Sequence, residues 1–355
     1  MNYLDKLSKQ QAYSLGKNEK NKIFFKEINN LTRHHYSHCK LYRKIIKNLN
    51  FKVSKNKEIQ DLPMLPVSIF KNFDLKSVSD NKVFRKLVSS GTSGKKLSKI
   101  YLDKKNAKNQ TIALKSIMST TLGKQRLPML IVDQNPNILD RSIFNARAAA
   151  IYGFSLFGKD YCYLLNKKNE IDYNLLNRFL KKYSKEKFLI FGFTSLIFEN
   201  LVKKISNRFT KFKFNNAILL HGGGWKKLEE MKVSNELFKR KLFKKLKIKN
   251  VFNYYGLVEQ IGSIFVECTC GNFITSNFSD VLIRDKNFNI SQNGKKGLIQ
   301  LISLLPTSYP GHNILTEDIG EIVDKNNLKC GIKGKHFKVH GRAKEAEIRG
   351  CSDAR

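Results

Sequence analysis

Three short apolar runs, separated by amphipathic segments, constrain the fold of this chain more than any other feature. The runs are LPMLIV (127–132), KFLIFGF (187–193) and NAILLHGGG (216–224). The segments between them, such as YNLLNRFLKKYSK and SLIFENLVKKISNRF, place apolar residues at helical spacing. Strands that alternate with helices are typical of an α/β fold with a largely parallel sheet. We therefore predict mixed, largely parallel sheets flanked by helices.

The two ends of the chain follow other patterns. Residues 1–60 have helical periodicity, and Pro63 and Pro66 then favour extended backbone, so we predict a helical N-terminal segment. From about residue 260, short runs such as FVECTCGNF and HFKVHGR predict a β-rich, antiparallel subregion. Residues 61–340 are predicted to form the main domain, and the polar residues 341–355 a short mobile tail.

The formal charge of +37 suggests an anionic partner. Only 13 of the 66 basic residues are Arg, and the lysines are scattered instead of forming one stripe. Because Arg makes the forked contacts by which bases and phosphates are recognised, specific nucleic-acid binding is a remote alternative. The charge is better matched to ATP or to an acidic carrier protein.

Two features that the sequence lacks predict the location of the protein and the redox state of its cysteines. No run reaches the roughly 20 apolar residues that cross a membrane, and the first residues lack the apolar region of a secretory signal. We therefore expect a cytoplasmic protein without a transmembrane segment. In that compartment the six cysteines are expected to be reduced thiols.

A hydroxyl-rich loop, SSGTSGKK (89–96), is the sharpest local signal. Small residues let backbone amides converge on an anion, while hydroxyls donate hydrogen bonds and Lys95 and Lys96 neutralise charge. The spacing does not match the G-x-x-x-x-G-K-[ST] nucleotide loop. Alone, the segment is equally typical of a surface turn.

Two later segments could serve the same nucleotide. Tyr255, beside Gly256, can offer its ring to a purine, and the Glu259 carboxylate can hold Mg2+ near phosphates. Asp318 in TEDIG can accept hydrogen bonds from ribose hydroxyls. Taken separately, the three are equally compatible with a core tyrosine, a surface glutamate and a turn aspartate.

The order of these segments resembles the adenylate-forming (AMP-binding) superfamily. More narrowly, the blocks LPMLPVSIFK, SSGTSG, HGGGWKK, NYYGLVEQIGSIFVEC, LPTSYPGHNILTEDIG and GKHFKVHGRAKEAEIRGCS are similar to LuxE-type acyl-protein synthetases, which are related to phenylacetate-CoA ligases. The resemblance extends from about residue 60 to the end of the sequence. It implies the large domain of an adenylate-forming ligase.

The resemblance also implies roles for individual residues. The ATP phosphates would be held by the loop residues Ser90, Gly91, Thr92, Ser93 and Gly94. The adenosine and Mg2+ would be held by residues of the later blocks, namely Gly222, Gly223, Gly224, Tyr255, Gly256, Glu259, Asp318 and Arg342. The substrate would be a carboxylic acid, such as a fatty acid, converted to acyl-AMP.

The sequence departs from the family pattern at several positions. Val258 stands where a Thr is usual, and Lys96 and Leu97 replace the usual Pro and Lys of the loop. Few residues follow Arg342, so the C-terminal lid with its catalytic Lys is expected to be largely absent. The charge that develops on the α-phosphate would then be met by Mg2+, the loop amides and Lys95 or Lys96.

Cys351 is the residue that the resemblance assigns as acyl acceptor. Arg349 favours its thiolate, and Gly350 lets the tail bend. The resemblance implies that an acyl reductase then takes the acyl group. Two alternatives remain open: transfer to CoA or to an acyl carrier protein, and a non-catalytic subunit that binds acyl groups or nucleotides.

Cys268, Cys270 and Cys330, with His336 nearby, form a candidate structural zinc site. The C-x-C spacing departs from the usual C-x2-C, and no second cysteine accompanies Cys330. A turn with reduced, buried thiols therefore remains the more conservative interpretation.

Overall fold

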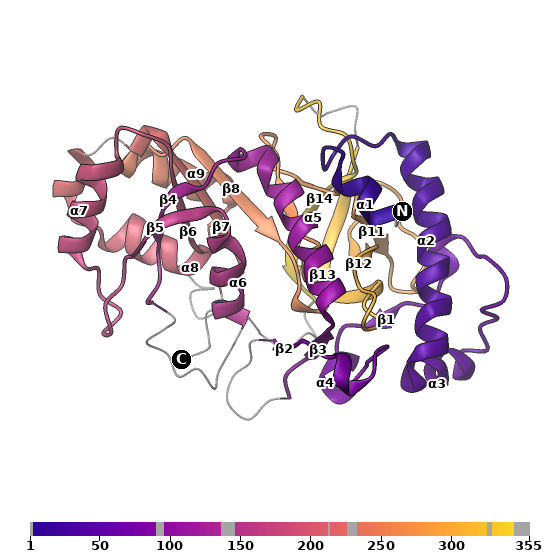
Figure 1. Cartoon of the computed structure of the whole chain (residues 1–355). Coiled ribbons are helices and arrows are strands. Elements are labelled where there is room, and N and C mark those ends of the chain that lie inside the picture. The colour runs from indigo at the N-terminus through magenta and orange to yellow at the C-terminus, as the bar shows by residue number, and fades with distance from the viewer. Residues whose placement is uncertain are drawn as a thin grey trace. The chain divides into compact units, whose positions relative to one another are not determined.

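The computed structural model describes residues 3–89, 96–135, 146–211, 214–225, 233–324 and 329–343 (Figure 1). These residues form two compact units, each described here by itself. Unit 1 consists of residues 3–89, 96–120, 256–324 and 329–343. Unit 2 consists of residues 121–135, 146–211, 214–225 and 233–255.

A parallel sheet forms the centre of unit 2. Its strand order is β5-β4-β6-β7-β8, and every neighbouring pair is parallel. The strands are β4 (Leu127–Ile131), β5 (Gly158–Tyr163), β6 (Phe188–Phe193), β7 (Ala217–Gly222) and β8 (Asn250–Tyr255). Three of them are the apolar runs identified in the sequence, and the predicted α/β architecture is confirmed.

Burial explains why these runs form central strands. Every residue of β4, β6 and β7 is buried, as expected for a parallel sheet that is covered on both faces. The covering segments are α6 (Ala146–Ser155), α7 (Tyr173–Tyr183), α8 (Thr194–Ile197), a π-helical segment (Phe198–Lys204), two 3-10 turns (Asn207–Lys211 and Phe214–Asn216) and α9 (Asn235–Leu246). The α7 helix begins at Asp172, whose carboxylate accepts hydrogen bonds from the amides of Asn174 and Leu175.

An antiparallel sheet dominates unit 1. Its strand order is β11-β12-β13-β14-β10-β9, with β1 parallel to β13. These strands are β1 (Leu65–Pro66), β9 (Phe265–Glu267), β10 (Phe273–Ile274), β11 (Ser279–Arg284), β12 (Gly297–Ser303), β13 (Asn313–Val323) and β14 (His336–Arg342). The predicted β-rich subregion is confirmed. A separate hairpin pairs β2 (Arg85–Val88) with β3 (Lys99–Leu102).

Most helices of unit 1 come from its N-terminal part. They are α1 (Tyr3–Ser8), α2 (Lys17–His38), α3 (Lys40–Asn48), α4 (Ile69–Asn72), α5 (Lys104–Leu122, which extends into unit 2) and 3-10 turns at Ile59–Asp61, Asp80–Lys82 and Val258–Gln260. Residues of α3, α4, β3 and β13 form one buried apolar cluster around Tyr42, Phe70 and Tyr309. The α3 helix is therefore part of this core, and α2 packs Tyr36 against it.

Two buried histidines connect α2 to the residue before β13. The His35 and His312 rings stack with centroids 4.9 Å apart. His35 donates from Nε2 to the Pro306 carbonyl at 3.1 Å, and its Nδ1 accepts from the Ser77 hydroxyl at 2.7 Å. Because Thr32 donates to the Ile28 carbonyl, it accepts from His312 Nε2 at 3.0 Å. These contacts suit neutral rings, and burial lowers the pKa of both histidines.

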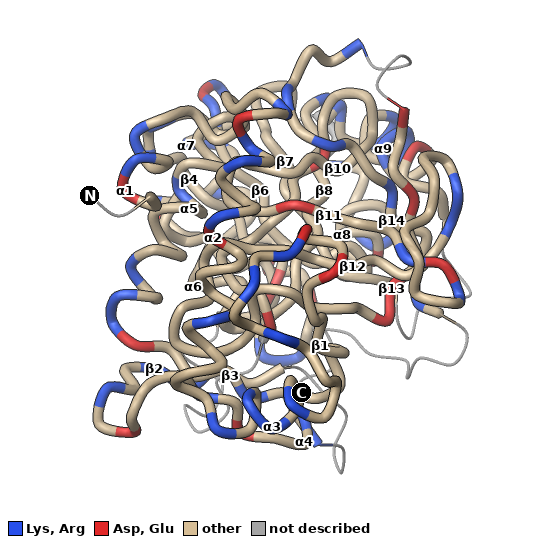
Figure 2. The backbone as a smooth tube through the Cα atoms, turned by 90° about the vertical axis from the view of Figure 1, so that its right-hand side faces the viewer, with Lys and Arg blue, Asp and Glu red and all other residues tan. Residues whose placement is uncertain are grey.

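The surface charge is distributed in the way the sequence suggests. Figure 2 shows Lys and Arg on α2, α3 and α9 and on many loops among the described residues. Within the described ranges, no helix is both long and apolar enough to span a membrane.

We predict that acid destabilises the protein through the histidine pair. Burial lowers the pKa of His312 to about 3 and that of His35 well below its ordinary value, with smaller contributions from neighbouring histidines. The unfolded chain binds these protons below about pH 6.5, whereas the folded chain does not. Each histidine should therefore reduce the free energy of unfolding by about 1.4 kcal/mol per pH unit as the pH falls below that value.

Urea unfolding between pH 7 and pH 4.5 measures this effect. In the His312→Gln variant, the free energy of unfolding should fall less steeply with decreasing pH, by the contribution of one histidine. His38→Gln, on the exposed end of α2, should have the same pH dependence as the wild type. Equal slopes for wild type and His312→Gln would contradict the assignment.

Candidate functional site

The β2–β3 hairpin positions the two ends of the hydroxyl-rich loop. The Ser89 amide donates to the Ser98 carbonyl at 3.0 Å, and the Ser98 amide donates to the Ser89 hydroxyl at 2.9 Å. The predicted phosphate-binding residues 90–94 and Lys95 lie outside the described residues, while Lys96 is described and exposed. The hairpin thus brings the chain segments on either side of the loop together.

Glu259 lies in the 3-10 turn after β8 and is buried, with 6% of its surface exposed. The turn is fixed by Gln260, whose amide donates to the carbonyls of Leu301 and Gly311 at 3.0 and 2.8 Å. Burial raises the pKa of Glu259, although the Ser98 hydroxyl and the charge of Arg342 oppose the shift. A bound cation would offset the desolvation of this carboxylate.

Asp318 and Arg342 face each other on paired strands, β13 and β14. Arg342 Nε lies 3.8 Å from an Asp318 carboxylate oxygen, and Arg342 Nη1 lies 3.4 Å from the Glu317 carboxylate. The Asp318 amide donates to the Thr316 hydroxyl at 3.1 Å, which holds the strand at its bulge. Three of the predicted site residues, Glu259, Asp318 and Arg342, thus belong to one charged cluster in unit 1.

In unit 2, the glycine segment follows β7 directly. A Cβ on Gly222 would lie 2.5 to 2.8 Å from ring atoms of Tyr254, so only glycine lets this ring pack against the strand. Gly223 has φ +76°, a left-handed conformation that side chains rarely adopt. Tyr255 is the last residue of β8 and is half-buried. The sheet therefore delivers the glycines and Tyr255 at the carboxyl ends of neighbouring parallel strands.

Two polar pairs at this edge were not singled out as site residues from the sequence. Thr194, after β6, donates to the Gly222 carbonyl and accepts from His221 Nδ1 at 2.9 Å. Burial lowers the pKa of His221 to about 3, with a smaller contribution from Lys239, so this ring is neutral. Arg147 donates from Nε to Asp133 at 2.6 Å, where β4 ends. Only their position after successive strands could have identified them.

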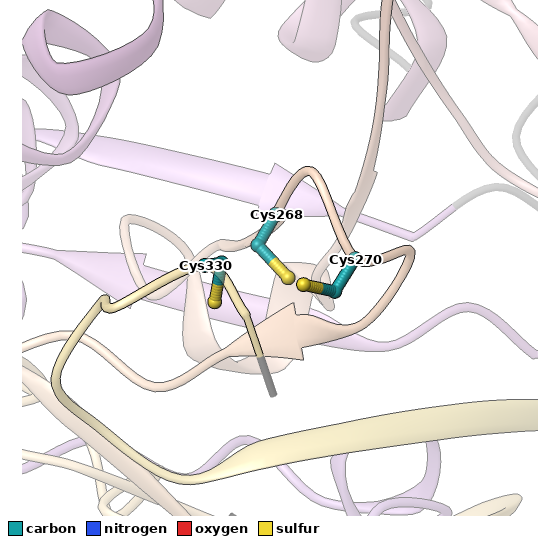
Figure 3. A group of neighbouring side chains, drawn as sticks. All are labelled: Cys268, Cys270 and Cys330. Carbon is teal, nitrogen blue, oxygen red and sulfur yellow. The ribbon is translucent and has the colours of Figure 1, made fainter. Parts of the chain in front are cut away.

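The structure describes three of the four cysteines to which the sequence assigned a possible role. Cys351 lies outside the described residues. Cys268, Cys270 and Cys330 come together, with all three sulfur atoms within 4.8 Å of one another. Figure 3 shows the Cys268 and Cys270 sulfurs turned toward each other, with Cys330 beside them on another loop. Their spacing in the sequence gave little indication of this proximity.

Comparison with solved structures defines the class of the fold. An open conformation of 2-hydroxyisobutyryl-CoA ligase, in complex with 2-HIB-AMP and CoA, matches 96% of this chain and 78% of its own, with a TM-score of 0.68 and 13% identity. ATP-bound MatB from Rhodopseudomonas palustris matches 77% of this chain with a TM-score of 0.51 and 14% identity, although the match spans only half of MatB. The fold is that of the adenylate-forming ligases.

The sequence narrows this class. The family described as acyl-protein synthetase, LuxE, matches residues 3–355, and the chain belongs to this family. A long-chain-fatty-acid–luciferin-component ligase from Photorhabdus luminescens is 39% identical over 79 residues, which are 22% of this chain and 66% of that protein, just under two thirds. The expected LuxE family is confirmed.

We predict that Gly222→Ala destabilises unit 2. The added methyl group would meet the Tyr254 ring at 2.5 Å, and such overpacking costs about 1–3 kcal/mol. Gly224→Ala is the matched control, because nothing lies within 4 Å of its Cβ position. Its free energy of unfolding should change by no more than about 0.5 kcal/mol in denaturant titrations. Equal effects of the two substitutions would contradict the close approach of Gly222 and Tyr254.

Proposed function

We propose that this chain activates a carboxylic acid, such as a fatty acid, with ATP and transfers the acyl group through a cysteine thiol to a partner reductase or transferase. The observation that carries the proposal is the family match across residues 3–355. The charged cluster of Glu259, Asp318 and Arg342, next to Ser98 at the base of the hydroxyl-rich loop, supports it.

The first proposed step forms acyl-AMP. A carboxylate oxygen of the acid attacks the α-phosphorus of ATP, the bond between the α-phosphorus and its bridging oxygen breaks, and pyrophosphate leaves. Since the acid is already ionised, this step requires no general base. The chain's part is to hold the two reactants in line and to stabilise the added charge on the α-phosphate.

The proposed ATP-binding residues bind different parts of the nucleotide. We assign the phosphates to Ser90, Gly91, Thr92, Ser93 and Gly94 with Lys95 and Lys96, the ribose hydroxyls to Asp318 with Arg342, and the adenine to Tyr255 and the glycines 222–224 and 256. Glu259 is the residue whose buried carboxylate suits Mg2+, and the ion would supply charge neutralisation at the phosphates. Arg342 lies beside the Asp318 carboxylate and would help to orient it.

The second proposed step moves the acyl group to sulfur. The Cys351 thiolate attacks the acyl carbon of acyl-AMP, the bond to the phosphate oxygen breaks, and AMP leaves with that oxygen. A thioester results, which a reductase or transferase can use. Transfer to CoA instead is the second candidate, since the fold matches a CoA ligase in complex with CoA.

We predict that Glu259→Gln abolishes most of the acid-dependent exchange of labelled pyrophosphate into ATP. Loss of the buried charge should lower the exchange rate at least about a hundredfold, because charge stabilisation at the phosphates is lost. Glu321→Gln is the matched control, since this carboxylate pairs with Lys338 on the neighbouring strand. If no acid supports exchange in the wild type, the chain is a non-catalytic subunit.

We predict a hydroxylamine-labile adduct on Cys351 after incubation with ATP and a panel of acids. Intact mass should rise by one acyl group, and Cys351→Ser should remove the adduct while pyrophosphate exchange continues. Cys162→Ser, which changes a buried cysteine of β5, should keep the adduct. Formation of acyl-CoA by Cys351→Ser at the wild-type rate would favour CoA as the acceptor.

A further inference from the structure

The three clustered cysteines of unit 1 come from two separate loops. Cys268 and Cys270 lie in the turn between β9 and β10, and Cys330 lies in the connection between β13 and β14. The first turn is closed by hydrogen bonds from the Cys268 amide to the Asn272 carbonyl at 2.8 Å and from the Gly271 amide to the Cys268 carbonyl at 2.9 Å. The backbone therefore holds two of the thiols before any metal binds.

A glycine in a left-handed conformation follows each loop's last cysteine. Gly271 has φ +80° after Cys270, and Gly331 has φ +65° after Cys330. These turns reverse the chain immediately after the thiols, which lets the loops approach with their sulfurs facing inward. The repetition on two unrelated loops indicates that the cluster is a built feature.

The sulfur positions suit a metal ion better than a disulfide. Thiolates bound to zinc at about 2.3 Å in tetrahedral geometry lie about 3.8 Å apart. All three sulfurs fall within 4.8 Å of one another, so small rotations of the side chains suffice. A disulfide would require two sulfurs at about 2.05 Å and would leave the third thiol over. All three are free thiols in the structure.

His336 is placed to be the fourth ligand. It is buried on β14, and its Nε2 lies 3.2 Å from the Cys330 sulfur. It is not in the group of ligand atoms within 4.8 Å of one another, so a ring movement toward the other two sulfurs would complete the site. Sulfur and nitrogen bound to the same tetrahedral zinc lie about 3.5 Å apart. The pairing of His336 with Ile274 fixes this residue beside the strand that follows the cysteine turn. One imidazole and three thiolates make a closed site of the structural kind.

We propose a structural zinc site in unit 1 with four ligands: Cys268, Cys270, Cys330 and His336. The ion ties the β9–β10 turn to the connection that leads into β14. Since β14 ends at Arg342, which contacts Glu317 and Asp318, the zinc stabilises the strand that carries part of the proposed ATP site. The site performs no chemistry on the substrate.

Metal analysis of the full chain, purified under reducing conditions without chelator, tests the proposal. We expect about one zinc ion per chain. Replacement with Co2+ should give the thiolate-to-cobalt charge-transfer bands and the intense visible bands of tetrahedral coordination. Wild-type protein without zinc, and without such a spectrum after Co2+ is added, would overturn the proposal.

Variants identify the ligands. Cys268→Ser, Cys270→Ser and Cys330→Ser should each lower zinc affinity at least about tenfold. Cys39→Ser and Cys162→Ser change buried cysteines elsewhere and should leave zinc binding unchanged. His336→Asn should weaken binding and shift the visible cobalt bands. An unchanged spectrum would remove His336 from the proposed ligand set.

A measurement on the wild-type protein tests the proposal even if the cysteine variants do not fold. Zinc should protect Cys268, Cys270 and Cys330 from alkylation, mapped by peptide mass, and a chelator should remove the protection. Cys270 is the most informative of the three, because it is exposed and would otherwise react readily. Alkylation at equal rates with and without zinc would overturn the proposal. None of these readouts requires acid activation, so they separate the zinc site from the proposed function.

Discussion

The burial of the Glu259 charge is the constraint on which the candidate site depends. A desolvated carboxylate raises the free energy of the folded state unless nearby groups favour its ionised form. Here the Ser98 hydroxyl and the charge of Arg342 do so, and Gln260 fixes the turn through two carbonyl groups. The β2–β3 hairpin and strand β14 therefore supply the groups that favour the ionised form of the buried Glu259.

The sequence predicted strands β4, β6 and β7 of unit 2 because burial on both faces requires continuous apolar runs. Each of β4, β6 and β7 is such a run, with β-branched or aromatic residues and no charge. It also predicted that Glu259, Asp318 and Arg342 serve one site, although it assigned them from motif order. The contact between Asp318 and Arg342 arises from the pairing of β13 with β14, whose register shifts at a bulge between Ile319 and Gly320.

Two other features depend on contacts between residues far apart in sequence, which the order of residues alone does not establish. The His35–His312 pair joins positions 277 residues apart, and burial lowers the pKa of both rings. The zinc ligands have an unusual C-x-C spacing, and their third cysteine follows some sixty residues later. The packing of β9, β10 and β14 brings them together. The sequence therefore suggested the candidate site, whereas the proximity of the three sulfur atoms is known only from the structure.

The contact between Gly222 and Tyr254 restricts the routes by which this site can change. Any side chain at position 222 collides with the ring unless position 254 has first become small. A chain in which both residues are replaced can therefore be reached through stable intermediates in one order only. Tyr254 must be replaced before Gly222. Lineages that keep the tyrosine should keep the glycine, so the two positions are expected to covary among homologous sequences.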